Sequence, residues 1–545
     1  MADLVSLAQP LKPASARAEH RVIPRASKSA IAIFIAAMLG GVLYIALHVA
    51  RDLDAVRTTT SWPYVLLGLA LLIALGFEFV NGFHDTANAV ATVIYTNSLT
   101  PNSAVVLSGI CNLLGVLVSS GAVAFAIITL LPVDLILQVS SGAGFAMVFA
   151  LLLAAILWNL GTWWLGLPAS SSHTMVGSII GVGIAHQLLN PQISTSGVDW
   201  DQARKVLESL LISPIIGFVL AGALLLLSKR LLRHPSLYEA PRGNEPPPFP
   251  IRALMVLTCT GVSFSHGQND GQKGMGLIML ILIGTVPTAY ALNHAVSPMG
   301  VQDFIAASER AVHILDQHSD YQRFDPAAPV QMPSRAEVTE YIRTRNLKPA
   351  TLPALRDLVN NLDIEVSHYG EYKAVPARDQ ANVRNDMYVA SEALRLMHAA
   401  NNPQFSSDEW AALDNYKSKV DNATKYIPTW VKVAVALALG LGTMVGWKRV
   451  VVTVGEKIGK AQLTYAQGAA AGVVAATTIF AATGFGLPVS TTHILSSGVA
   501  GTMAANGSGL RLKTIRNIAA AWVFTLPAAA LLSAGLYWVF WHLTH

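Results

Sequence analysis

The chain has 545 residues, of which 53% are hydrophobic and 13% are charged, and its formal net charge at pH 7 is +5. Soluble domains carry about 25% charged residues, so this composition excludes an ordinary soluble protein and indicates a chain that lies in lipid. The two cysteines stand far apart in apolar segments, which excludes a disulfide framework. The modest basic charge lies at the flanks of apolar runs, so we expect no nucleic-acid partner.

Long apolar runs recur along the chain, and they approach or exceed the roughly 20 residues that a helix needs to cross a bilayer. Backbone amides cannot stay unpaired in hydrocarbon, and the runs lack a two-residue alternation, so helices are expected and a barrel is not. The sequence therefore predicts an all-α membrane protein embedded in a lipid bilayer. The runs are 31–49, 64–80, 104–131, 145–165, 210–227, 431–445 and 519–540.

Lysine and arginine are distributed unevenly among the short loops, which sets the expected orientation. Residues 1–29, 229–252, 447–464 and 506–516 together hold seventeen basic residues, whereas 51–61 and 188–205 hold four. We therefore expect a multi-pass membrane protein with a cytoplasmic N-terminus and a periplasmic C-terminus near His545.

The same reasoning divides the chain into parts. A polar stretch has apolar residues at helical spacing, such as Leu355, Leu358 and Leu362, and we expect it to be a helical extramembrane insert on the periplasmic side. The predicted parts are a cytoplasmic tail (1–29), a first transmembrane half with repeat 1 (30–228), a cytoplasmic linker (229–252), a helix of repeat 2 (253–291), the insert (292–426) and the remaining transmembrane segments (427–545).

Two sequence elements occur twice. Residues 79–88 match 264–273 at an offset of 185, with Phe, Gly and Asp in common, and 166–173 match 486–493 at an offset of 320, with Gly, Leu, Pro, small hydroxylated residues and His in common. The expected topology gives the copies opposite directions across the membrane. We therefore predict an inverted-repeat transporter with interrupted helices and two re-entrant hairpins, an architecture typical of alternating access.

The first repeated element places a carboxylate, Asp85 or Asp270, inside an apolar span, where a charge is costly without a partner. Gly82, Gly267 and Gly271 are expected to relax the helix, and the two aspartates to bind a cation or a proton. The alternative is a polar packing motif with satisfied aspartates, which the duplication disfavours. His84 and His266 are further candidates for proton coupling, and Lys273 is a candidate for pairing with Asp270 or for contacting an anionic substrate.

The second repeated element has a proline followed by small residues, the last two hydroxylated, at the expected start of a helix. Ser171, Ser172, Thr491 and Thr492 would then supply donors at a positive helix end, as an anion requires, and two such tips could enclose a tetrahedral oxyanion. Capped turns at the membrane interface are the alternative. His173 and His493 follow the hydroxyl residues symmetrically and are candidates for proton handling or for a structural role.

On these motifs the chain resembles the PiT family of inorganic phosphate transporters, and within it the low-affinity, proton-coupled transporters of Gram-negative bacteria. The resemblance implies import of phosphate as a neutral complex with a divalent metal such as Mg²⁺, in symport with protons, with no cofactor and no fixed metal site. It implies these phosphate-binding residues: Thr86, Asn88, Asn269, Ser170, Ser171, Ser172, Ser490, Thr491 and Thr492. From the residues themselves we expect cation or proton coupling by Asp85, Asp270, His84, His173 and His493. The resemblance also implies the bacterial inner membrane as the location.

Two departures from sodium-coupled relatives bear on the coupling ion. His84 precedes Asp85 where those relatives usually carry Asn, and Asn112 stands where they carry an acidic residue. Both departures weaken the hypothesis that transport is coupled to sodium, which stays as the alternative. An anion channel would need a ring of positive charge, which the sequence lacks. A membrane enzyme would need a nucleophile motif, which the sequence also lacks. A homodimer is left open.

Overall fold

The computed structural model describes residues 27–53, 62–137, 141–191, 197–241, 245–319 and 333–544, without the side chains of 62–63, 86–88 and 544. Within these residues the secondary structure is helical, and the one β-contact is an isolated bridge between Gly459 and Leu510. The predicted all-α membrane fold is confirmed.

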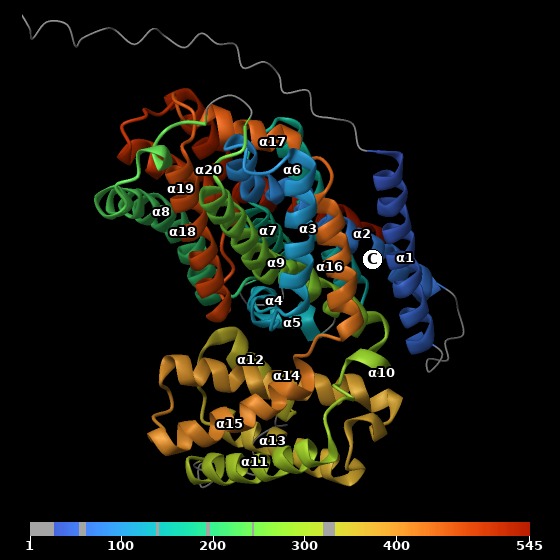
Figure 1. Ribbon diagram of the computed structural model, residues 1–545. Helices are drawn as coiled ribbons and strands as arrows, with labels where there is room; N and C mark the ends of the chain where they lie inside the picture. The colour runs from blue at the N-terminus through green and yellow to red at the C-terminus, as the bar shows by residue number, and fades with distance from the viewer. Residues whose placement is uncertain are drawn as a thin grey trace, which may run out of the picture.

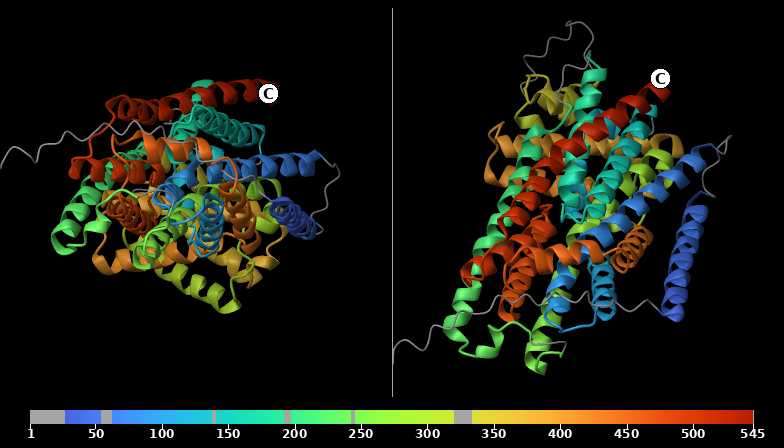
Figure 2. Two further views of the ribbon diagram at one scale, coloured as in Figure 1. Left: turned by 45° about the horizontal axis from the view of Figure 1, so that its top comes forward. Right: turned by 90° about the horizontal axis from the view of Figure 1, so that it is seen from above.

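Six of the described helices are long and apolar enough to cross a membrane, and two bent helix pairs pass the same test. The six are α1 Lys28–Leu53, α2 Trp62–Tyr95, α6 Gly142–Trp164, α8 Trp200–Leu231, α18 Tyr465–Gly484 and α20 Leu512–Thr544. The bent pairs are α3 Pro101–Leu117 with α4 Ala122–Ile128, at 75°, and α15 Ser407–Thr424 with α16 Thr429–Thr443, at 70°. Every predicted apolar run falls on one of these elements. Helix α1 stands at the edge of the bundle (Figures 1 and 2).

The run 104–131 differs from the expectation of one long apolar helix, because it breaks between α3 and α4. Gly121, directly before α4, has a φ of 91°, a left-handed conformation that a helix cannot continue through. A short helix, α5 Val133–Leu137, follows. The second half has a similar break: α16 ends ahead of Gly446 (φ 73°), and α17 Lys448–Val452 and the π-helical turn η4 Thr453–Lys457 come next.

The two carboxylate motifs lie in continuous helices, α2 and α9 Phe249–Thr285, so the predicted interruption at their glycines is wrong. These glycines serve close helix crossing instead. A Cβ atom on Gly82 would lie 2.3 Å from Leu439 O of α16, and one on Gly267 would lie 2.2 Å from Asn112 O of α3. The two motifs therefore lie at equivalent helix crossings. The helix breaks occur in the partner helices, after α3 and after α16.

Helices α2 and α9 run antiparallel. Arg252, near the start of α9, donates to Ser98 O just beyond the end of α2 (2.9 Å), and Gly274, further along α9, donates to Glu78 earlier in α2 (2.8 Å). Because α9 leads into the insert, its C-terminal half and the N-terminal half of α2 form the side of the bundle that faces the insert.

The second repeated motif starts α7 Ser171–Leu189 and α19 Thr491–Ala505, each after a helix that carries the chain inward. Helix α7 lies along α20, with Trp522 donating to Pro168 O (3.0 Å) near its start and His186 bonded to Tyr537 (2.9 Å) near its end. Helix α19 lies along α8 in the same direction, since Ser209 donates to Pro488 O (2.8 Å) and a Cβ on Gly222 would lie 3.2 Å from Gly501 O. Each hairpin is thus held by the last helix of the other half.

The insert forms a separate helical layer beneath the bundle in Figure 1. It contains α11 Pro298–Gln317, α12 Ser334–Thr344, α13 Thr351–Tyr369, α14 Ala377–Ala400 and α15, with Phe304, Leu355 and Tyr416 in its core. The short elements are η1 Pro235–Leu237, α10 Pro287–Tyr290 and η3 Tyr372–Ala374.

Arginines of the insert bind carboxylates at the near end of the bundle. Arg343 pairs with Asp134 of α5, and Arg345 and Arg395 pair with Asp199, the N-cap residue of α8, at 3.0 and 3.1 Å. The insert is therefore joined by the chain to the second half of the bundle and by ion pairs to the first.

Candidate substrate site

Asp85 of α2 lies where the starts of both hairpin helices converge. Its carboxylate accepts hydrogen bonds from Ser171 of α7 (2.7 Å) and Thr492 of α19 (2.7 Å), and the ring of His84 lies 3.1 Å from it. All of these side chains are buried. One carboxylate thus ties together α2 and the two tips, and these residues come from both halves of the chain.

Asp270 of α9 occupies the equivalent place opposite Asp85. It pairs with Lys273 at 2.6 Å, and Ser171 donates to it at 3.2 Å. The Lys273 ammonium also donates to Ser172 at 2.5 Å. The first hairpin tip is therefore held between the two aspartates, with a buried lysine supplying positive charge.

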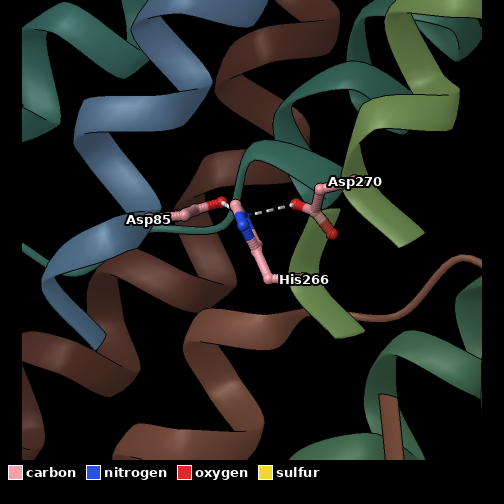
Figure 3. A group of neighbouring side chains, drawn as sticks. All are labelled: Asp85, His266 and Asp270. Carbon is pink, nitrogen blue, oxygen red and sulfur yellow. Dashed lines mark ion pairs between the residues drawn. The ribbon is translucent and has the colours of Figure 1, made fainter. Parts of the chain in front are cut away.

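His266 completes a cluster with the two aspartates, drawn in Figure 3. Its Nε2 atom lies 3.5 Å from Asp270 and 4.0 Å from Asp85, and one ligand atom from each of the three residues lies within 4.8 Å of the others. The other ring nitrogen of His266 bonds to Asn112 (2.8 Å), which fixes the ring. Two carboxylates and an imidazole at these distances suit a cation.

The two hairpin tips also touch each other directly. Ser172 donates to Val489 O at 2.7 Å, and the rings of His173 and His493 lie 4.4 Å apart, with Trp522 stacked on His493 at 4.0 Å. His173 Nδ1 and His493 Nε2 are buried and have no hydrogen-bond partner within the described part of the chain. His173 and His493, two of the three histidines predicted to handle protons, thus lie at the contact between the tips, whereas the third, His84, lies against Asp85.

The predicted phosphate-binding residues divide into different roles. Ser170 and Ser490 cap α7 and α19, since their hydroxyls accept from the backbone of His173 (3.2 Å) and His493 (3.1 Å). A hydroxyl that accepts an N–H bond in this way satisfies the helix end. Thr491 has a buried hydroxyl with no partner among the described residues, so it remains available to a ligand.

Asn269 holds the second tip in place. Its amide donates to Thr483 (2.9 Å) and to Leu487 O (3.1 Å), and its carbonyl oxygen accepts from Val489 N (3.3 Å). In this structure it therefore positions the tip. The side chains of Thr86 and Asn88, also predicted to bind phosphate, lie outside the described residues.

Some polar residues of the site were considered as candidates from the sequence but not assigned a role, and one was missed. Lys273 and His266 stand within the repeated motif, so the signal was present. Glu78, fully buried one residue before the motif, was missed altogether. An acidic residue within the predicted apolar run 64–80 was the available signal, because any intramembrane carboxylate calls for a function.

A buried pair of carboxylates beneath the starts of two helices, inside a bundle of membrane-length helices, defines a multi-pass membrane protein with an interior polar site. The chain belongs to the phosphate transporter family, whose model matches residues 81–533. The resemblance drawn from the motifs is therefore confirmed.

Named relatives match over most of their length. The low-affinity inorganic phosphate transporter PitA of Escherichia coli (strain K12) is 44% identical over 87% of this chain and 96% of its own, and PitB of the same strain is 42% identical with the same coverage. A probable low-affinity inorganic phosphate transporter of Bacillus subtilis (strain 168) is 28% identical over 87% and 98%. A solved structure described as the sodium-dependent phosphate transporter matches with a TM-score of 0.47 and 19% identity, over 87% of this chain and 98% of that chain.

Proposed function

We propose that the protein is a secondary active transporter that imports inorganic phosphate by alternating access, as a neutral complex with a divalent metal such as Mg²⁺ and in symport with protons. The bacterial inner membrane is its proposed location, with a cytoplasmic N-terminus. The observation that carries the proposal is the position of Ser171, which donates to Asp85 and to Asp270 from the first turn of α7. Membership of the phosphate transporter family and the names of the relatives support phosphate as the substrate.

The donors and charges of the site fit a phosphate that enters with a cation. Hydroxyls of Ser171, Thr491 and Thr492, at the positive ends of α7 and α19, can donate to an oxyanion. The adjacent Asp85 and Asp270 would repel that anion on their own. A divalent cation held by these two carboxylates would remove the repulsion and neutralise the phosphate, which favours reorientation of the loaded carrier in a medium of low dielectric.

The arrangement of the hairpins supports alternating access. Helix α7 leaves the site toward the insert, whereas α19, which follows α8 away from the insert, leaves it in the opposite direction. Together with the antiparallel α2 and α9, this is the relationship expected of an inverted repeat. Each tip then closes the site toward one side of the membrane. When one tip moves away while the other stays in place, the site is open to one side at a time.

Phosphate uptake into proteoliposomes, under separately imposed pH and sodium gradients and with or without Mg²⁺, tests the proposal. We expect accumulation when the interior is alkaline and Mg²⁺ is present, and no stimulation by sodium. Uptake driven by sodium alone would contradict proton coupling, uptake indifferent to Mg²⁺ would contradict the metal complex, and currents far above carrier turnover would indicate a channel.

A further inference from the structure

Glu78 is a carboxyl group of α2 that the site described above does not use. It is fully buried, and its Oε1 atom accepts the Gly274 amide at 2.8 Å while its Oε2 atom has a long contact of 3.4 Å with the Asn81 amide. It forms no ion pair with any residue of the described ranges. The fit is close, because a Cβ atom on Gly274 would lie 2.3 Å from Oε1.

The position of Glu78 relates it to both aspartates. It precedes Asp85 by seven residues, which places it on the same face of α2 and about 10 Å away along the axis. Its partner Gly274 follows Lys273, whose ammonium binds Asp270. Since this part of α9 leads to the insert, Glu78 lies on the insert side of the aspartates.

The charged groups that face Glu78 come from α9: Lys273 attracts its negative charge and Asp270 repels it. Helices α3, α4 and α6 carry no charged side chain, and α16 carries only Lys432, which donates to Ser119 O at 2.7 Å. The Lys273 ammonium is bonded to Asp270 and Ser172. Among the described residues, Lys273 is therefore the cation whose charge acts on Glu78, and its ammonium is bonded to other groups.

The three buried carboxyl groups thus differ in how their charge is supported. Asp85 accepts from two hydroxyls and lies beside His84, and Asp270 is paired with Lys273. Glu78 has one peptide N–H at good distance. A carboxylate removed from water without a cation is costly, so the surroundings of Glu78 stabilise the acid that holds a proton.

We infer that Glu78 is a proton-binding site of the transport cycle, a role that rests on the proposed proton symport and extends it. The proton binds from water on the insert side, the side from which phosphate enters, and leaves to water on the other side. Only the carboxyl O–H bond forms and breaks.

The test compares two activities of the full-length protein in proteoliposomes. Net phosphate uptake driven by a pH gradient requires proton release, whereas exchange of internal for external phosphate at equal pH does not. Glu78→Gln keeps an acceptor for Gly274 but cannot titrate. We expect it to lower net uptake about tenfold more than it lowers exchange and to flatten the pH dependence of uptake. Glu208→Gln, on the half-exposed side chain of α8, is the control.

The outcomes separate this inference from the proposed function. If Glu78→Gln accumulates phosphate with the pH dependence of the wild type, Glu78 is not the proton site. If Glu78→Gln loses exchange as well, Glu78→Asp decides: restored pH-driven uptake supports a titrating carboxyl, and continued loss overturns the inference. A wild type that ignores the pH gradient and responds to sodium would overturn proton symport itself.

Discussion

Thr492 and Asp85 are separated by 407 positions in the sequence, yet the Thr492 hydroxyl donates to the Asp85 carboxylate at 2.7 Å. The bond joins the start of α19, in the second half of the chain, to the middle of α2, in the first. Ser171 reaches the same carboxylate from the first hairpin. A movement that opens either tip must therefore break a hydrogen bond to Asp85, and a ligand that replaces that hydrogen bond can drive the movement.

Removing the charge of either aspartate should abolish driven phosphate uptake. Asp85→Asn and Asp270→Asn keep the shape of the side chains but remove the anion that would hold the co-transported cation. We expect each to lower net uptake in proteoliposomes by at least about tenfold, with normal amounts of protein in the membrane. Asp201→Asn, on an exposed residue of α8, is the matched control. Normal accumulation by both variants would make the two carboxylates structural.

Neighbouring serines of the first tip should respond differently to loss of the hydroxyl. Ser170 caps α7, so Ser170→Ala should lower the stability of the protein by about 1 kcal/mol, seen as a lower melting temperature in detergent. Ser171 bonds to both aspartates and faces the proposed ligand, so Ser171→Ala should raise the KM for phosphate by about tenfold. An increase in KM for Ser170→Ala at unchanged melting temperature would show that Ser170 binds the substrate.

The structure brings together residues that the sequence singled out where charge and duplication coincide. Asp85 and Asp270 are conspicuous in apolar spans, and their repetition with the two hydroxyl motifs indicated that distant segments meet. Which hydroxyl caps and which faces the site could not be predicted. Ser170 and Ser171 have the same side chain, and only the backbone at the helix start separates their roles.

The errors concern packing between helices. A glycine beside an intramembrane aspartate is typical of an unwound helix and of a close crossing alike, and Gly82 was assigned to the first although it serves the second. The choice depends on Leu439, which is hundreds of residues away. The hairpin helix of each half packs against the last helix of the other half, α7 on α20 and α19 on α8. These tertiary contacts could not be predicted from any local sequence pattern either.

The ion pair between Arg343 of the insert and Asp134 of α5 should contribute to docking of the insert. Asp134→Arg places a second positive charge beside Arg343, at a position where the wild-type carboxylate is largely buried. The double variant Asp134→Arg with Arg343→Asp restores a pair of opposite charges. We expect a coupling of about 1 kcal/mol in a double-mutant cycle on thermal unfolding. The exposed pair Arg204 and Glu208 should give a smaller coupling, because solvent screens the two charges. Equal couplings at both places would mean that the insert is not held by this contact.

Asp421 should make the insert sensitive to acid. Burial alone would raise the pKa of Asp421, but Lys425 and Lys417, at 2.8 and 2.6 Å, together hold that pKa below its ordinary value. Ser391 of α14 donates to the same carboxylate at 2.6 Å, so Asp421 links α15 to α14.

A carboxyl whose pKa is lower in the folded state stabilises that state above its ordinary pKa of about 4, and the contribution is lost as the pH falls below that value. Hydrogen exchange of α14 and α15, corrected for the intrinsic rate at each pH, should therefore quicken below about pH 4. In Asp421→Asn the stabilisation is absent at every pH, so exchange should be faster at neutral pH and change less on acidification. A wild type and variant with the same pH dependence would mean that other carboxyl groups carry the acid sensitivity, and that the two lysines do not stabilise the insert through Asp421.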